Sequence, residues 1–413
     1  MSDHLRADPA DEQTLLVTIS GDDRPGVTSA LFDAIADVGA EVRDLEQVVV
    51  RNHLTLAMLL VAGPQTDRLD NVIHLVARSL GLSVKVERGI GDSSTGRTGR
   101  GAVVLLGSPL RAGAVAAITA RIASHGANID RIRRLSRYPV TTVEFDISGA
   151  ELDRLRRELA LEATLQGVDV AVAAAGLARR GRRLVVMDVD STLIQQEVIE
   201  MLAAHAGRAT EVRAVTERAM RGELDFAESL RERVKVLAGL DEAVLDEVRQ
   251  AVVLTPGART LVRTLKRLGF TVALVSGGFI EIVSQIAQEL DIDRAEANHL
   301  EIIDGKLTGN VIGEIVDRAG KARALHRFAA EEGLPLSRTV AIGDGANDLD
   351  MLASAGLGVA FNAKPVVREQ ADAAVNVPYL DAVLYLLGIT REEIEEADAA
   401  DGTPTPAPAL PPR

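Results

Sequence analysis

The sequence predicts an α/β protein in which two small βαββαβ domains precede a doubly wound parallel-sheet domain with a helical cap insertion. Three observations support this prediction. The first half of the chain contains an internal repeat, and the second half alternates short apolar strands with helices. A long helical stretch follows the first of these strands.

The repeat in the first half is visible in the spacing of its glycines. Gly26 lies 87 residues before Gly113, and Gly39 lies 87 residues before Gly126. In each copy an apolar strand, a turn and a helix are followed by strand, strand, helix and strand, which is typical of an antiparallel sheet with helices on one face. The expected elements of the first copy are Leu15–Ser20, Val27–Val38, Val42–Val50, Leu54–Val61, Leu69–Leu80 and Val84–Val86. Those of the second are Val103–Leu106, a helix ending at Gly126-Ala127, Ile129–Leu135, Thr141–Ile147, Leu152–Leu165 and Val168–Val172.

The second half has the pattern of a buried parallel sheet. Three short apolar runs, Leu184–Met187, Thr271–Val275 and Thr339–Ile342, are separated by helical stretches. The stretch from Asp190 to about Leu254 is almost entirely helical in pattern, which predicts an insertion after the first strand. The segment Ile302–Ile315 predicts a hairpin that turns at Asp304-Gly305.

These patterns divide the chain into parts. We expect small domains at residues 13–88 and 102–175, and a larger domain at 182–390 with its cap at about 195–255. Gly89–Gly101 is rich in Gly, Ser, Thr and Arg and is expected to be a linker. The Pro-rich segment 401–413 is expected to be a disordered tail.

Composition excludes several classes of protein. The chain has 413 residues, a net charge of −14 and no cysteine, which rules out disulfides, thiolate catalysis and cysteine-ligated metals. Its acidity, with 7 Phe, 3 Tyr and no Trp, argues against nucleic-acid binding. An apolar signal core and a membrane-length apolar run are both missing, so we expect a cytoplasmic protein without membrane association.

Four polar motifs follow apolar strands or begin a helix. Asp188 and Asp190 leave the first strand two residues apart, at the strand end where α/β sheets bind ligands. Ser276 and Gly277 offer a hydroxyl and an open backbone N–H to an anion. Lys321 lies near the start of a helix. The segment 343–348, with sequence GDGAND, offers the carboxylates of Asp344 and Asp348 to a hard cation.

In this order, the four motifs resemble the haloacid dehalogenase-like phosphatase superfamily over about residues 184–387. The resemblance implies that Asp188 is a nucleophile forming an aspartyl-phosphate and that Asp190 is the general acid and base. It also implies Mg²⁺ held by Asp188, the Asp190 carbonyl and Asp344, with Asp348 in support. The groups implied to bind the phosphate are Ser276, Gly277 and Lys321.

The inserted helices narrow the resemblance to phosphoserine phosphatases. Glu197 is implied to meet the substrate ammonium and Arg233 its carboxylate, which a guanidinium can bind through both oxygens. Met220 and Phe226 are implied to be apolar walls that exclude water, and Asn347 to orient the substrate. Read without the resemblance, Glu197 and Arg233 are better explained as solvated helix positions, and the two apolar residues as helix packing.

The repeat resembles tandem ACT domains, which are ferredoxin-like amino-acid-sensing modules. GDDRPG, which begins at Gly21, is a fair match to their strand-to-helix turn. The second copy keeps Gly107 and Gly113 but lacks the acidic residue and the Pro position. The resemblance implies a possible serine effector at Gly21 and Gly107, and a homodimer; modules that pack without a ligand are the alternative.

The resemblance therefore implies Mg²⁺-dependent hydrolysis of O-phospho-L-serine, the last step of serine biosynthesis, with serine inhibition through the ACT domains. Two alternatives stay open. One is a phosphotransferase, or a phosphatase acting on another small phosphomonoester. The other is an amino-acid-sensing regulatory protein. Every catalytic position holds a residue that is chemically able to act, which argues against this alternative.

Overall fold

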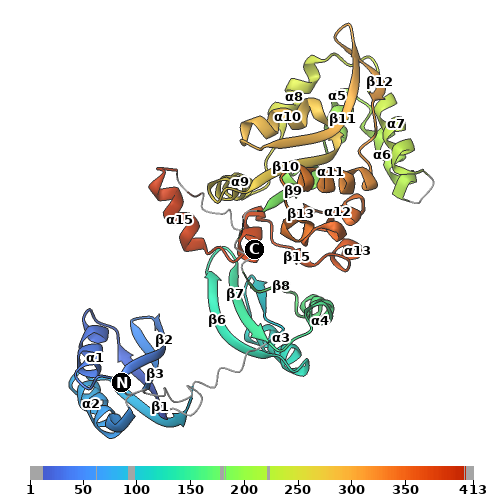
Figure 1. Cartoon of the computed structure of the whole chain (residues 1–413). Coiled ribbons are helices and arrows are strands. Elements are labelled where there is room, and N and C mark those ends of the chain that lie inside the picture. The colour runs from blue at the N-terminus through green and yellow to red at the C-terminus, as the bar shows by residue number, and fades with distance from the viewer. Residues whose placement is uncertain are drawn as a thin grey trace, which may run out of the picture. The chain divides into compact units, whose positions relative to one another are not determined.

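The computed structural model describes residues 13–61, 63–91, 98–176, 181, 183–220, 224–403 and 405, except for the side chains of residues 217, 219 and 220 (Figure 1). The chain forms two compact units, residues 1–97 and 98–413. The expected linker and tail lie partly outside the described residues. None of the described helices is both long and apolar enough to cross a membrane.

The first unit has the expected βαββαβ order. Its antiparallel sheet has the strand order β2-β3-β1-β4, with both helices packed on the buried core. The elements are β1 (Gln13–Asp22), α1 (Val27–Ala36), β2 (Glu41–Val50), β3 (His53–Val61), α2 (Thr66–Ser79) and β4 (Ser83–Ile90). Strand β4 runs past the expected Val86 because it pairs with β1 along its whole length, out to the pair of Ile90 and Gln13. The first residues of the expected linker are therefore strand.

The second copy of the repeat folds in the same way. Its elements are β5 (Gly101–Gly107), α3 (Ala112–Ser124), β6 (Asn128–Ser136), β7 (Thr141–Ser148), α4 (Leu152–Gln166) and β8 (Asp169–Ala174). Strand β5 is buried throughout and pairs with β7 on one side and β8 on the other, both antiparallel. The predicted duplication is thus confirmed at the level of fold.

The remainder of the second unit is the predicted doubly wound sheet. Its strands are β9 (Leu184–Met187), β10 (Thr271–Phe279), β11 (Arg294–Ile303), β12 (Lys306–Ile312), β13 (Thr339–Gly343), β14 (Leu357–Phe361) and β15 (Ala373–Val375). They lie in the order β12-β11-β10-β9-β13-β14-β15, parallel except for β12. Strands β11 and β12 form the predicted hairpin, with Asp304 and Gly305 both at positive φ in the turn.

Two separate cores show that helices cover both faces of this sheet. Side chains alternate along β9, so Val185 and Met187 enter one core while Leu184 and Val186 enter the other. The helices outside the cap are α9 (Ala258–Arg267), α10 (Ile280–Glu289), α11 (Arg318–Glu331), α12 (Leu349–Ser354), α13 (Pro365–Arg368), α14 (Val383–Leu386) and α15 (Arg391–Ala400).

The insertion after β9 is helical, as predicted. It contains α5 (Val198–His205), α6 (Ala209–Met220), α7 (Phe226–Lys235) and α8 (Ala243–Ala251). Backbone hydrogen bonds join the α7–α8 connection to the β11–β12 hairpin, from the Gly239 and Glu242 N–H groups to Leu307 and Gly305 and from Leu307 N–H to Leu240. The cap is therefore attached to the edge of the sheet as well as to the strand from which it departs.

One feature was not expected from the sequence. Strand β8 of the second repeat pairs with β15, so the repeat and the larger domain share one continuous 11-stranded sheet. The join consists of the single pair Ala373 and Ala171. Asp169 strengthens it by accepting hydrogen bonds from the Asn376 backbone and side-chain amides, the former at 2.7 Å. The second repeat is therefore structurally part of the larger domain.

Candidate active site

The candidate site lies where the order of the parallel strands reverses. Strand β9 is central, the next strand in sequence (β10) lies on one side, and β13 lies on the other. Connections leave such a point in opposite directions, so a crevice opens at the carboxyl ends of the strands. Asp188 follows β9, Ser276 lies near the end of β10, and Asp344 follows β13.

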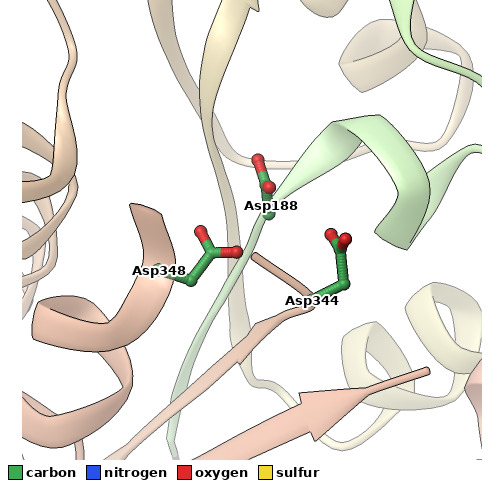
Figure 2. A group of neighbouring side chains, drawn as sticks. All are labelled: Asp188, Asp344 and Asp348. Carbon is green, nitrogen blue, oxygen red and sulfur yellow. The ribbon is translucent and has the colours of Figure 1, made fainter. Parts of the chain in front are cut away.

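Three carboxylates meet in this crevice. Asp188, Asp344 and Asp348 each place one oxygen within 4.8 Å of the others, and Figure 2 shows them facing a common space. Burial raises the pKa of Asp188, and it raises that of Asp344 to about 6, with further increases from neighbouring carboxylates. The negative charge concentrated here needs compensating positive charge, and hard divalent cations prefer such oxygen ligands.

Lys321 supplies part of that positive charge. Its ammonium is completely buried and lies 2.8 Å from Asp188 Oδ1 and 2.6 Å from Asp348 Oδ1. Burial alone would lower the pKa of Lys321, but the two carboxylates more than offset this and raise it. The backbone at the start of its helix is fixed because Asp317 caps α11, accepting from the Gly320 backbone N–H. Lys321 is therefore a fixed positive charge beside the carboxylate cluster.

The anion-binding residues predicted at 276 and 277 lie beside the cluster in a tight loop. Ser276 is fully buried, and its Oγ accepts a hydrogen bond from the Gly278 backbone N–H at 2.8 Å. A Cβ at Gly278 would lie 3.0 Å from Asp190 Oδ2, and one at Gly277 would lie 2.9 Å from Phe226 Cζ. The glycines thus let both Asp190 and the cap approach the loop backbone closely.

Asp190 lies between the strand end and the cap. Its carboxylate accepts a hydrogen bond from the Val198 backbone N–H at 3.2 Å. Burial raises the pKa of Asp190 to about 7, and the charge of Glu197 adds to this increase. A carboxyl whose pKa lies near neutrality can both give and accept a proton, which suits a general acid and base.

The cap contributes charges of both signs. Glu197 is exposed at the start of α5 and accepts a hydrogen bond from Ser191 Oγ at 2.7 Å. Arg233 is half-buried on α7; burial lowers the pKa of its guanidinium, while Glu197 and Asp190 act in the opposite direction. Glu197 and Arg233 thus lie near enough to Asp190 for their charges to act on it, and Phe226 lies against Gly277.

Two further predicted residues have simpler placements. Asn347 is half-buried in the short turn between Asp344 and Asp348. Met220 is the last residue of α6, and its side chain lies outside what the structure describes.

Sequence reasoning assigned no role to two neighbouring hydroxyls. Thr192 is fully buried and donates to Asp344 Oδ1 at 2.9 Å, while Ser191 donates to Glu197. Ser191 has φ 57°, a left-handed conformation that turns the chain between Asp190 and the cap. Both lie in the motif DVDST, so the motif was the available signal, although the partner of Thr192 lies 152 residues away.

The glycines of the two ACT-like turns have different surroundings. A Cβ at Gly21 would lie 2.6 Å from Leu82 Cδ2, so this turn is packed against its own domain. Gly107 lines a cavity of about 320 Å³ between the second repeat and the larger domain.

The fold and site together have the features of one class of hydrolase. Residues 185–353 match the family model of haloacid dehalogenase-like hydrolases, and residues 13–87 and 100–173 each match an ACT-domain model.

Similarity to individual proteins extends over nearly the whole chain. It is 61% identical to a phosphoserine phosphatase of Streptomyces coelicolor over 94% of this chain and 95% of that protein. It is 52% identical to one of Mycobacterium tuberculosis, over 94% and 96%. The chain belongs to the phosphoserine phosphatase family.

Solved structures agree with this assignment. The structure of a probable phosphoserine phosphatase of Vibrio cholerae is 36% identical, with a TM-score of 0.56 over 70% of this chain and 86% of that one. A HAD-family hydrolase of Salmonella enterica is 28% identical, with a TM-score of 0.60 over 69% and 98%.

Proposed function

We propose that this enzyme hydrolyses O-phospho-L-serine to L-serine and phosphate through an aspartyl-phosphate, with Asp188 as nucleophile. The observation that carries the proposal is that two carboxyl groups at the end of one strand, Asp188 and Asp190, have different electrostatic surroundings. Asp188 is ion-paired to Lys321, whereas Asp190 has a pKa near neutrality and faces the charges of the cap. One is suited to attack phosphorus and the other to move protons.

In the first step an Asp188 oxygen forms a bond to phosphorus while the ester P–O bond breaks. Asp190 gives its proton to the departing serine oxygen, so serine leaves as a neutral alcohol. In the second step the ionised Asp190 takes a proton from water as that water attacks phosphorus, and the acyl phosphate P–O bond breaks. Asp188 is thereby regenerated as a carboxylate and Asp190 as an acid.

The phosphoryl oxygens need positive charge and hydrogen-bond donors throughout. We assign this role to Lys321, the Ser276 hydroxyl and the Gly277 N–H. The carboxylate cluster suits Mg²⁺, because three buried or half-buried carboxylates offer oxygen ligands in a fixed arrangement. Asp188, the Asp190 backbone carbonyl and Asp344 would hold it, with Asp348 in support, and when bound it offsets the charge on the phosphoryl oxygens.

The cap charges match the remaining groups of the substrate. Phosphoserine carries an ammonium and a carboxylate beside its phosphate, and Glu197 and Arg233 offer one partner to each. Phe226, packed over Gly277, would exclude water from the phosphoryl group. We assign Asn347 to substrate orientation and Met220 to a second apolar wall.

The test is phosphate release from O-phospho-L-serine against a panel of sugar phosphates and other phospho-amino acids, with Mg²⁺ present. We expect a clear preference for phosphoserine and loss of at least about 1,000-fold in kcat for Asp188→Asn. Equal rates across the panel would refute the substrate assignment, and an active Asp188→Asn would refute the mechanism.

The same residues could transfer the phosphoryl group to an alcohol other than water. Analysis of the products formed with homoserine present separates transfer from hydrolysis. Retained serine binding in a chain that releases no phosphate from any ester would instead support the sensor alternative.

We also propose that serine inhibits the enzyme through the ACT domains, and one cavity favours this idea. The cavity beside Gly107 is lined by Asp169, Asp372 and Arg368. Within the described chain Arg368 makes no ion pair, and its side chain donates a long hydrogen bond, 3.4 Å, to Asn376 Oδ1. A zwitterion could place its carboxylate at Arg368 and its ammonium at the aspartates. Because the cavity borders β15, occupancy would act on the sheet that carries the site.

The effector proposal is tested by serine titration of the wild type and Arg368→Ala. We expect the inhibition constant of serine to rise about tenfold in the variant, with uninhibited kcat unchanged. Arg137→Ala, at an exposed arginine of the second repeat, is the control. Inhibition that is unchanged in Arg368→Ala places the effector elsewhere, for example at Gly21.

We assign residues 13–88 and 102–175 to regulation and 182–390 to catalysis, with the cap at about 195–255. A homodimer is expected from side-by-side association of ACT domains, which light scattering tests. The biosynthetic role and the charge composition support a cytoplasmic enzyme that binds neither nucleic acid nor membranes.

A further inference from the structure

We propose that Asn298 is a positioning residue for phosphoryl transfer, because its buried amide sets the spacing between the anion loop and the helix that carries Lys321. The inference deepens the proposed function and rests on its assignment of Ser276, Gly277 and Lys321 to phosphate binding. Asn298 does not belong to any of the motifs recognised in the sequence.

The contacts of Asn298 join two segments that are 39 residues apart. Its Nδ2 donates to the Gly277 carbonyl at 2.8 Å, and its Oδ1 accepts from the Val316 backbone N–H at 2.8 Å. Only 2% of the residue is exposed. The two bonds use both ends of one planar amide, so the separation between the two backbone segments is set by the size of that group.

Each of these backbone segments leads directly to a proposed phosphate-binding group. Gly277 follows Ser276, whose hydroxyl is already held by the Gly278 N–H. On the other side, Val316 precedes Asp317, whose backbone carbonyl accepts from the Lys321 N–H at 2.9 Å. A shift at either end of the Asn298 amide therefore moves a phosphate-binding group relative to Asp188.

The ladder between the strands is interrupted at this point. Parallel pairing of β10 with β11 shifts register between Val275 and Phe279, and resumes with Phe279 opposite Asn298. The loop at 276–278 lies in this irregular stretch, where it lacks regular strand partners. The amide of Asn298 supplies a bond that the ladder does not, which explains a buried polar side chain in this strand.

Asparagine is the residue whose shape and hydrogen-bonding pattern fit both partners. Leucine has a similar size but makes neither bond, leaving a buried carbonyl and a buried N–H unpaired. Aspartate keeps the acceptor for Val316 but, when ionised, turns an oxygen toward the Gly277 carbonyl in place of a donor. Asn298→Leu thus removes both hydrogen bonds, whereas Asn298→Asp mainly removes the one to the anion loop.

The experiment measures kcat, KM and inhibition by inorganic phosphate for both variants of the full-length enzyme with Mg²⁺. Two substrates are used, O-phospho-L-serine and p-nitrophenyl phosphate. We expect kcat to fall about 10- to 100-fold with both substrates and phosphate inhibition to weaken, because small displacements of reacting groups are costly. Similar losses with the two esters show that the phosphoryl-binding groups moved rather than the serine-binding groups.

Matched controls use Asn310, which lies on β12 of the same hairpin. Asn310 is exposed, and its side chain donates to Glu301. Asn310→Leu and Asn310→Asp are expected to retain kcat within about twofold.

A purely structural role for Asn298 would lower the melting temperature but leave kcat per folded molecule unchanged. Rates are therefore measured well below each variant's melting temperature, with the folded fraction determined by circular dichroism. Unchanged kcat in folded Asn298→Leu and Asn298→Asp overturns the proposal, as does failure of both variants to fold. If the wild type prefers another ester to phosphoserine, the proposed substrate fails, while the comparison on p-nitrophenyl phosphate still tests Asn298.

Discussion

Lys321 Nζ lies 2.8 Å from Asp188 Oδ1, so the proposed nucleophile is paired with a lysine that is itself completely buried. The same ammonium contacts Asp348 at 2.6 Å, and burial raises the pKa of Asp188. One cation thus holds two carboxylates that would otherwise repel each other in a region of low polarity. The pairing stabilises the site and opposes the effect of burial, so it favours the ionised form of Asp188.

Replacing Lys321 should therefore destabilise the metal-free protein. Lys321→Met leaves two buried carboxylates without their cation, and we expect the free energy of unfolding to fall by about 3–5 kcal/mol. Added Mg²⁺ should recover part of the loss, because it supplies positive charge to the same carboxylates. Urea denaturation with EDTA and with Mg²⁺ measures both effects.

Lys364→Met is the control for this prediction, since Lys364 is exposed. It should change the free energy of unfolding by less than about 0.5 kcal/mol. A Lys321→Met protein as stable as the wild type in EDTA would contradict the interpretation.

The charges of the cap predict a crossed pattern of substrate discrimination. Glu197→Gln should lower kcat/KM for phosphoserine about 10- to 100-fold but have little effect on 3-phosphooxypropanoate, which lacks the amino group. Arg233→Met should likewise spare phosphoethanolamine, which lacks the carboxylate. Steady-state kinetics of each variant on the three esters checks the pattern. Equal losses of kcat/KM on all three esters would show that the two residues do not bind the ammonium and carboxylate groups.

Asp190 is expected to act in both chemical steps. Asp190→Asn retains a similar size but cannot transfer a proton, so kcat should fall about 10²- to 10⁴-fold. Because the attacking water loses its base, the aspartyl-phosphate should persist longer than in the wild type. Acid quenching after incubation with ³²P-labelled phosphoserine, followed by measurement of protein-bound label, detects this. Asp188→Asn provides the unlabelled blank. If Asp190→Asn is also unlabelled, its low kcat comes from a blocked first step, and the expected persistence of the aspartyl-phosphate is contradicted.

Local patterns were sufficient to predict much of this molecule. The apolar run Leu184–Met187 is a central strand because four buried residues can be covered only inside a layered sheet, and the carboxylates of DVDST follow at its end. Both are short-range signals. The β8–β15 join was not predictable, because it rests on the pair Ala373 and Ala171, two small residues with no distinctive spacing.

The site was predictable where residues belong to motifs and unpredictable where one polar side chain acts at a distance. Asn298 contacts the backbone at residues 21 before and 18 after it. Nothing in its neighbourhood, ANHL, distinguishes it from an ordinary strand position. The partners of Thr192 were equally hidden, since Asp344 lies 152 residues away. Such contacts depend on the tertiary fold, which single-sequence patterns do not specify.

The closeness of Phe226 to Gly277 predicts a steric effect on the cap. A Cβ at Gly277 would lie 2.9 Å from Phe226 Cζ, so Gly277→Ala requires the ring or the cap to move. We expect KM for phosphoserine to rise about tenfold in Gly277→Ala, because the cap no longer seats over the loop. The double variant Gly277→Ala with Phe226→Leu should recover part of the loss, which steady-state kinetics measures. If the effects of the two single substitutions on KM simply add in the double variant, the two residues do not clash.

The C-terminal helix α15 offers a prediction about stability and pH. Asp398 is fully buried on this helix and accepts hydrogen bonds from Arg263 at 2.9 and 2.6 Å, from Arg267, and from Thr405. Burial alone would raise the pKa of Asp398, but these bonds outweigh it and the pKa is lowered. We expect Asp398→Asn to lower the free energy of unfolding by about 1–3 kcal/mol at pH 7, since the arginines remain partly solvated.

The sign of the pH dependence follows from the lowered pKa. An unfolded aspartate titrates near about 4, so the stability contributed by Asp398 is fully present above that pH. It is lost as the pH falls below about 4 toward the lowered folded-state pKa. The difference in unfolding free energy between wild type and Asp398→Asn should therefore be constant from pH 8 to pH 5 and shrink below pH 4, as urea titrations at each pH would show. Asp401→Asn removes the exposed partner of Arg267 and should cost less than about 1 kcal/mol; a difference for Asp398→Asn that grows as the pH falls would contradict the assignment.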